Sequence, residues 1–154
     1  MPIRKRILLV DDNPADLEIA AQAFGLAGIT LLDTAHSLEE ALEYLQRRGR
    51  HSERRTADPT LILLDLNMPG GSGLDLLRHI KSDPLFSLTP VVMLTTSSAS
   101  SDIEACYRHG ANGYVVKPSR FSDFQEVVLS LKSFWLSFNR TATPTSPQNT
   151  KWWL

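Results

Sequence analysis

The sequence contains very little cysteine and no long hydrophobic run, and each absence excludes a class of protein. Its one cysteine, Cys106, excludes an intramolecular disulfide framework and any metal site built from several cysteines. A single cysteine also fits a reducing, cytoplasmic compartment. No apolar run approaches the roughly 20 residues that a membrane-spanning helix needs. The run after the charged N-terminus stops at Asp11, too early for a secretory signal.

The sequence also lacks an excess of charge of one sign. It has 16 Lys and Arg against 17 Asp and Glu, which gives a formal net charge of −1. That balance argues against a protein held to nucleic acid or anionic lipid by bulk charge. We therefore expect neither nucleic acid nor a membrane among its partners.

What is present is the composition of one globular domain. A length of 154 residues suits a single domain, and 42% hydrophobic with 21% charged residues is ordinary. From residue 139 onward the composition turns to Thr, Pro, Ser and Asn. We predict a folded domain over 5–138 and a flexible C-terminal tail over 139–154. Such a tail is too short to form a DNA-binding or enzymatic output domain.

Five short apolar runs alternate with five segments of helical periodicity. The apolar runs are 7–10, 30–34, 61–64, 91–94 and 114–116. The continuously apolar run 61–64 is typical of a central strand covered on both faces. The apolar stripe of the last helix comprises Phe124, Val127, Val128, Leu131, Phe134, Trp135 and Phe138. This alternation predicts an α/β fold, with a parallel sheet and helices on both of its faces.

Capping signals predict where the helices begin. Asn13 and Pro14 precede the first helix, which Gly28 closes. A Gly-rich turn at 68–71 precedes a helix near 72–82. Ser-x-x-Glu or Ser-x-x-Gln spacing predicts capping pairs at three further helices. These pairs are Ser37 with Glu40, Ser101 with Glu104, and Ser122 with Gln125.

Two other features carry no chemistry of their own. Residues 47–58 break the periodic pattern, and we interpret them as a long, basic, solvated loop. The four histidines show no spacing that suits a metal site or a catalytic triad. We expect all four at the surface: His36, His51, His79 and His109.

Polar side chains follow the apolar runs at the points where strands end. They are Asp11, Asp12, Asp65, Thr95, Thr96 and Lys117. In an open parallel sheet the carboxyl ends of the strands meet at one edge, and ligands bind there. We therefore expect these residues, distant in sequence, to share one site.

The residue types at this edge suit phosphoryl transfer. Three crowded carboxylates repel one another unless a cation compensates, and Mg²⁺ is the obvious candidate cofactor. Lys117 and Thr95 supply a cation and a hydroxyl for phosphoryl oxygens, and an aspartate beside the metal is a possible nucleophile. Taken alone, each motif also has a plain structural interpretation, as a helix-capping turn or a strand end. The combination is what favours the site.

Together these motifs resemble the receiver domain of bacterial two-component response regulators. The matching segments, in order over about residues 6–136, are 8–12, 63–70, 92–96 and 113–118. Finer features resemble the single-domain response regulators of phytochrome-type histidine kinases: segments 12–16, 47–58, 94–97 and 134–136. The resemblance implies a flavodoxin-like (βα)5 three-layer sandwich with a five-stranded parallel sheet in the order 2-1-3-4-5.

The resemblance also implies roles for the site residues. Asp65 would accept the phosphoryl group, and Thr95 and Lys117 would contact it. The metal ligands would be Asp11, mainly through water, Asp12, Asp65 and the backbone carbonyl of Asn67. A cis peptide bond would precede Pro118.

Further residues would act in switching and tuning. Thr95 and Tyr114 would form the conformational switch that follows phosphorylation. The side chains of Asn67 and Ser97 would tune the rates of phosphorylation and dephosphorylation.

These roles imply a signalling protein and not an enzyme, because it would promote only its own phosphorylation and dephosphorylation. Its partners would be a sensor histidine kinase, in a phytochrome-type light-signalling phosphorelay, and a downstream target or phosphotransfer protein. Leu129 and Leu136 lie off the apolar stripe of the last helix. We therefore predict a homodimer through the face formed by the fourth helix, fifth strand and fifth helix, with 134–138 contributing.

Three other functions stay open. A Mg²⁺-dependent phosphatase of the haloacid dehalogenase type also forms an aspartyl phosphate. It needs an Asp-x-Asp pattern, however, and residues 11–13 depart from that pattern. Turnover of a small phosphoester would identify such a phosphatase. A flavodoxin would carry a hydroxyl-rich phosphate cradle and would be coloured. A pseudo-receiver would act as a scaffold without taking up phosphate.

Overall fold

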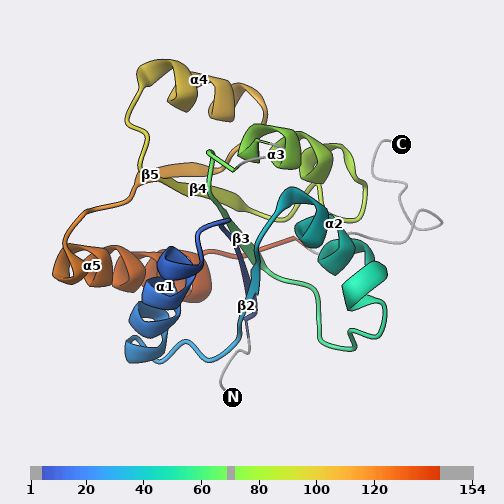
Figure 1. The fold of residues 1–154 in the computed structure, drawn as a ribbon, viewed down its shortest axis with the longest axis horizontal. Coiled ribbons are helices and arrows are strands. Elements are labelled where there is room, and N and C mark those ends of the chain that lie inside the picture. The colour runs from blue at the N-terminus through green and yellow to red at the C-terminus, as the bar shows by residue number, and fades with distance from the viewer. Residues whose placement is uncertain (1–4, 69–71, 143–154) are drawn as a thin grey trace.

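The computed structural model describes residues 5–68 and 72–142, which form a three-layer α/β sandwich (Figure 1). Its parallel sheet has the order β2-β1-β3-β4-β5, which confirms the predicted order. The strands are β1 (Ile7–Val10), β2 (Leu32–Ala35), β3 (Leu61–Leu64), β4 (Val91–Thr95) and β5 (Gly113–Val116). The predicted turn at 68–71 and the predicted tail at 139–154 lie largely outside the described residues.

Five α-helices connect and cover the strands. They are α1 (Pro14–Leu26), α2 (Leu38–Gln46), α3 (Gly73–Ser82), α4 (Ser100–Arg108) and α5 (Phe121–Leu131). A 3₁₀ turn, Gly49–His51, lies between α2 and β3, and a π-helical segment, Lys132–Phe138, continues α5. Within the described ranges, no helix combines the length and the apolar character that crossing a membrane requires.

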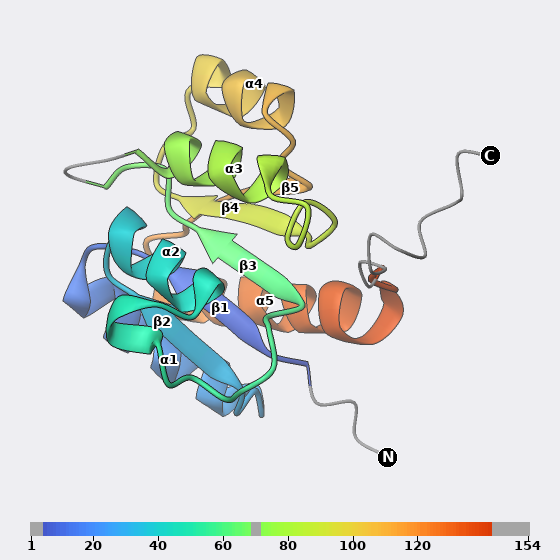
Figure 2. The same ribbon diagram turned by 90° about the vertical axis from the view of Figure 1, so that its right-hand side faces the viewer.

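The sheet is apolar on both faces because successive side chains of a strand point to opposite sides. Leu8 and Val10 of β1 pack with residues of α2, α3 and α4. Ile7 and Leu9 of the same strand pack with residues of α1 and α5. The two helical layers therefore lie on opposite faces of the sheet (Figures 1 and 2). This packing leaves the carboxyl ends of the strands free to form a site.

The predicted caps hold for the first helices. The Asn13 side chain accepts hydrogen bonds from the backbone N–H groups of Ala15 and Asp16, as predicted for α1. Ser37 accepts from the N–H of Glu40 at α2. The Glu40 carboxylate, however, accepts from the N–H of His36 and not from that of Ser37. The pair therefore caps α2 without closing the reciprocal box.

The predicted caps of α4 and α5 are wrong. Both helices begin one residue before the predicted serine, after Ala99 and Arg120, and neither of these has a side-chain cap. At α4 the Ser97 hydroxyl, which is bonded to Asp102, accepts from the N–H of Ala99. A reciprocal capping box between Ser72 and Asp75 begins α3. The Ser-x-x-Glu and Ser-x-x-Gln patterns did not predict it, because the fourth residue here is Asp.

The C-terminal end of the last helix also differs from the prediction. The wider turn of the π-helical segment changes which side chains face the core. Phe134 and Phe138, predicted to be inward, are 51% and 78% exposed. Leu136, predicted to be off the core face, packs partly against the core. Leu129 is exposed, as predicted.

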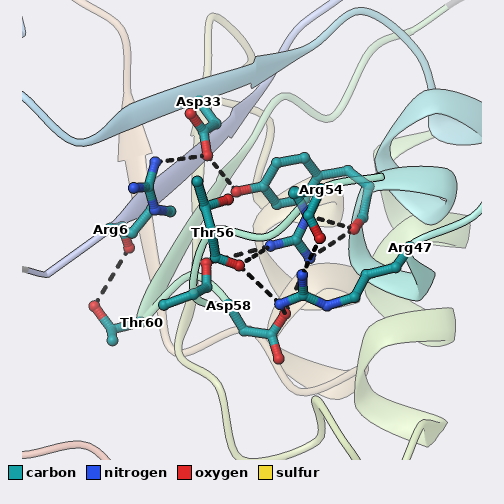
Figure 3. Close-up of polar contacts among 9 residues, drawn as sticks. Arg6, Asp33, Arg47, Arg54, Thr56, Asp58 and Thr60 are labelled. Atoms are coloured by element: carbon teal, nitrogen blue, oxygen red, sulfur yellow. Dashed lines mark hydrogen bonds and ion pairs between the residues drawn. The ribbon is translucent and has the colours of Figure 1, made fainter. Parts of the chain in front are cut away.

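The 47–58 loop is held against the body of the protein by Arg54 (Figure 3). The guanidinium donates to the carbonyl oxygens of Tyr44 at 2.7 Å and Thr56 at 2.9 Å, and to Asp58 at 3.0 Å. It also lies 4.0 Å from the centre of the Tyr44 ring, and only 6% of the side chain is exposed. The prediction of a solvated loop is therefore wrong at this residue.

His51 also departs from its predicted surface position. Its ring packs edge-on against Tyr44, with the ring centroids 5.3 Å apart. Its Nε2 lies 3.3 Å from the Glu40 carboxylate. The loop therefore contributes two side chains to the packing around Tyr44, which pattern analysis of a basic segment could not reveal.

We expect Arg54→Ala to lower the free energy of unfolding by about 2–3 kcal/mol. Truncation removes the donors to the Tyr44 carbonyl, at the end of α2, and the cation from the face of the Tyr44 ring. Urea unfolding followed by circular dichroism measures the loss. Arg55→Ala removes an exposed neighbouring charge and is the matched control. Equal stabilities of the two variants would contradict a structural role for Arg54.

Candidate functional site

Hydrogen bonds that continue the parallel ladder align the ends of the strands. The N–H of Asp11 donates to the carbonyl of Ala35 at 3.1 Å, and the N–H of Asp65 donates to that of Val10 at 3.0 Å. Between β4 and β5, the N–H of Lys117 donates to the carbonyl of Thr95 at 2.7 Å. The residues after β1, β3 and β5 are therefore fixed at one edge, as the sequence predicted.

The start of α3 packs directly against the backbone of Asp65. A Cβ atom on Gly73 would lie only 2.1 Å from the Asp65 carbonyl oxygen and 2.8 Å from Cα of Leu66. The N–H of Gly73 donates to the Leu66 carbonyl at 2.8 Å. Glycine is therefore required at position 73, because any side chain would displace the backbone that positions Asp65.

Three carboxylates meet at this edge. One oxygen of each of Asp11, Asp12 and Asp65 lies within 4.8 Å of the others. Asp11 is buried, whereas Asp12 and Asp65 are partly exposed. A set of carboxylate oxygens with solvent access fits a hard divalent cation such as Mg²⁺, which keeps several waters. The structure thus brings together the three acidic residues that the sequence predicted as metal ligands.

Lys117 reaches into this acidic group. Its Nζ lies 2.5 Å from Oδ2 of Asp11 and 3.7 Å from Oδ2 of Asp16. Burial lowers the pKa of Lys117, but the hydrogen bond and charge of Asp11 outweigh that effect, so the pKa is raised. Lys117 is therefore charged at neutral pH. Asp16 was not predicted as a site residue, because its place in the first turn of a helix is ordinary for an acid.

The environment of Asp65 disfavours its charged form. Burial raises the pKa of this carboxyl most, and the negative charge of Asp11 raises it further. Lys117 and the Thr95 hydroxyl act in the opposite direction without cancelling the shift. An unneutralised carboxylate at this position therefore costs free energy, which a bound cation would reduce.

Thr95, Ser97 and Tyr114 are linked through the segment after β4. Thr95 is fully buried, and its hydroxyl accepts from the N–H of Ser97 at 3.4 Å. The Tyr114 hydroxyl donates to the Ser97 carbonyl at 2.9 Å. The Ser97 hydroxyl is 2.6 Å from the Asp102 carboxylate. This chain of contacts connects the end of β4 with β5 and with the first turn of α4.

The remaining predicted residues lie around this centre. Asn67 is exposed, and its N–H donates to Oδ1 of Asp65 at 3.5 Å. Thr96 is exposed and lines a neighbouring cavity. The predicted cis bond before Pro118 is wrong, since the described residues contain no cis peptide bond. Trans is the favoured isomer even before proline, by about 0.5–1 kcal/mol.

A cavity of about 430 Å³ opens beside Lys117, between α1 and the segment that connects β5 to α5. Its walls include the apolar side chains of Leu9, Leu94 and Phe124, and its charged residues are Asp11, Asp16, Lys117 and Arg120. A cavity with apolar walls and a charged edge therefore adjoins the site at Asp11 and Lys117.

Comparison with known proteins decides the family. The model of the response regulator receiver domain matches residues 7–129. The chain belongs to this family. Several curated relatives match over most of the chain, among them the following two. The probable methanogenesis regulatory protein FilR2 of Methanothrix harundinacea is 34% identical over 90% of this chain and 88% of its own. The response regulator Rcp1 of Synechocystis is 36% identical over 86% and 89%.

Solved structures of response regulators superpose closely on this receiver. The phosphorylated cyanobacterial phytochrome response regulator RcpA has a TM-score of 0.81 and 37% identity, covering 90% of this chain and 99% of that one. The Mn²⁺-bound form of Rcp1 has a TM-score of 0.80 and 34% identity, with the same coverage. The fold and the family resemblance seen in the sequence are thus confirmed.

Proposed function

We propose that this receiver accepts a phosphoryl group on Asp65 from the phosphohistidine of a sensor kinase, in a Mg²⁺-dependent reaction. One observation carries the proposal: the carboxylates of Asp11, Asp12 and Asp65 converge within 4.8 Å beside the ammonium of Lys117. This set combines a nucleophile, oxygen ligands for a metal and a cation for a phosphoryl oxygen. The protein would act as a signalling component and not as an enzyme with a separate substrate.

The reaction proposed is an in-line displacement. A carboxylate oxygen of Asp65 forms a bond to phosphorus as the bond from phosphorus to the kinase histidine nitrogen breaks. The bonding pair leaves with the imidazole, and Asp65 becomes an acyl phosphate. Thr95 and Lys117 bind two of the phosphoryl oxygens, so the charge that spreads over these oxygens is neutralised.

Metal binding would involve Asp11, Asp12, Asp65 and the backbone carbonyl of Asn67. Bound Mg²⁺ would supply positive charge at the phosphoryl oxygens. The acidic cluster and the Mn²⁺-bound form of the relative Rcp1 support a divalent cation. In the absence of the ion, Lys117 carries the neutralising charge nearest to Asp11.

We further propose that phosphorylation switches an interaction face through Thr95 and Tyr114. Movement of the buried Thr95 toward the phosphoryl group would alter its contact with Ser97, whose carbonyl binds the Tyr114 hydroxyl. The shift would reach the α4–β5–α5 face, to which Tyr114 belongs. The side chains of Asn67 and Ser97 would set the rates of phosphorylation and dephosphorylation.

The proposed pathway is a phytochrome-type light-signalling phosphorelay in the cytoplasm. Support comes from the likeness to the phytochrome response regulator RcpA. Phosphotransfer profiling tests this pathway. At equal concentration, a histidine kinase that senses red light should phosphorylate this protein faster than kinases that sense other stimuli. Preferential labelling by a kinase of another stimulus would reject the light pathway and leave the phosphoreceiver proposal intact.

We also propose that receiver residues 5–138 form a homodimer through the α4–β5–α5 face. Exposed apolar side chains of α5 and the π-helical segment, among them Leu129, Phe134 and Phe138, support a contact surface. Phe134→Ser should weaken association at least tenfold in sedimentation velocity. Leu85→Ser, which removes an exposed apolar side chain after α3, is the control. A wild-type protein that stays monomeric at high micromolar concentration would contradict the dimer.

A further inference from the structure

Two carboxylates from different parts of the chain share the ammonium of Lys117. Asp11, at the end of β1, is 2.5 Å from Nζ and only 3% exposed. Asp16, in the first turn of α1, is 3.7 Å from Nζ and 42% exposed. The first contact belongs to the acidic cluster, whereas the second lies outside it.

The Asp16 side chain belongs neither to the acidic cluster nor to the cap of α1. In the described part of the chain, the carboxylates that converge as a cation-binding group are Asp11, Asp12 and Asp65, without Asp16. The cap of α1 is made by Asn13, to which Asp16 contributes only its backbone N–H. The Asp16 side chain is thus available to act on Lys117.

Asp16 lies on the α1 side of Lys117. Asp16 and Lys117 both line the cavity beside α1, whereas Asp65 does not line it within the described ranges. Asp65 also attracts Lys117, since its charge is one of the causes that raise the pKa of the lysine. The ammonium of Lys117 is therefore shared among carboxylates that compete for it.

We propose that Asp16 is a positioning residue that retains Lys117 on the α1 side of the site in the unphosphorylated protein. The inference rests on the proposed phosphorylation of Asp65. To reach a phosphoryl oxygen, Lys117 must give up its interaction with Asp16. Asp16 therefore stabilises the unphosphorylated state more than it stabilises the transition state of phosphorylation. This difference raises the barrier, so Asp16 slows the forward reaction.

Hydrolysis of the acyl phosphate should not depend on Asp16. Lys117 is bound to the phosphoryl group both in the phosphorylated protein and in the transition state for its hydrolysis. Asp16 therefore changes the free energies of these two states equally, and an equal change leaves the rate of hydrolysis as it was. Removing the Asp16 charge should accelerate formation of the acyl phosphate and leave its decay as it was.

The test uses the full chain with Mg²⁺ and acetyl phosphate as the donor. Asp16→Asn should raise the phosphorylation rate roughly two- to five-fold, the range that an exposed ion pair supports. The decay rate after donor removal should match that of the wild type. Asp16→Glu, which keeps the charge, should restore the wild-type rate. Glu18→Gln removes one exposed charge from the same helix and should change neither rate.

A second readout reports on the lysine itself. The ¹⁵N chemical shift of Lys117 Nζ should change in Asp16→Asn and stay constant in Glu18→Gln. Equal phosphorylation rates in wild type and Asp16→Asn, or an equal gain in Glu18→Gln, would overturn the inference alone. Absence of phosphate on the wild type would overturn the proposed function together with it.

Discussion

Asp65→Asn should abolish uptake of phosphate from a cognate kinase and from acetyl phosphate. The substitution removes one of the three converging carboxylates while preserving the size of the side chain. The remaining Asp11 and Asp12 have no assigned role as acceptors. Intact-protein mass spectrometry measures the added phosphate, and Asp123→Asn, an exposed acid on α5, is the control. Acid-labile phosphate on the variant would show that another residue is the acceptor.

The same substitution should not unfold the protein. The pKa of Asp65 is raised in the folded state, mainly by burial, so the folded protein holds the proton more tightly than the unfolded chain does. Ionised Asp65 therefore lowers stability above its unfolded pKa, and this loss disappears as the pH falls below that value. In Mg²⁺-free buffer at neutral pH, Asp65→Asn should be at least as stable as wild type. The difference should shrink on acidification.

Lys117→Ala should have the second large effect, on stability as well as on switching. It leaves Asp11, which is only 3% exposed, without its cation. Removing one partner of a buried pair costs about 3–5 kcal/mol, and we expect about 3 kcal/mol here because the site is open to water. Denaturant unfolding in Mg²⁺-free buffer measures the loss. Added Mg²⁺ should recover much of it by neutralising the same carboxylates.

The switching defect of Lys117→Ala is separate from its stability. With Mg²⁺ present, the variant should still bind the metal but should not transmit phosphorylation to the α4–β5–α5 face. Amide NMR spectra recorded before and after phosphorylation measure the spectral change in each variant. Lys117→Arg is the charge-preserving control. A full wild-type spectral change in Lys117→Ala would contradict the role assigned to this lysine.

The fold was predictable because the pattern of this sequence is periodic and local. Strand β3 consists of four consecutive apolar residues, and apolar stripes mark the helices around it. This pattern indicates a sheet that is covered on both faces. The strand order and the grouping of Asp11, Asp65 and Lys117 follow from the topology of such sheets and from the family resemblance. No knowledge of exact side-chain positions is needed for these inferences.

What the sequence could not predict depends on geometry between distant segments. Arg54 resembles every other cation of a basic loop, and only the folded chain places it against the end of α2. The π-helical turn that exposes Phe134 has no residue pattern of its own, because the same apolar residues would suit an α-helix. Asp16 acquires a partner only when the fold brings Lys117, which follows β5, to the first turn of α1.

The central claim is that one cation-binding acidic cluster makes Asp65 a reversible phosphate acceptor. Peptide mapping of the wild-type protein after acetyl phosphate treatment, with Mg²⁺ or with a chelator in its place, tests it most directly. We predict one phosphate, located on Asp65, only in the presence of Mg²⁺. A phosphate on any other residue, or equal labelling of Asp65 without the metal, would contradict the account.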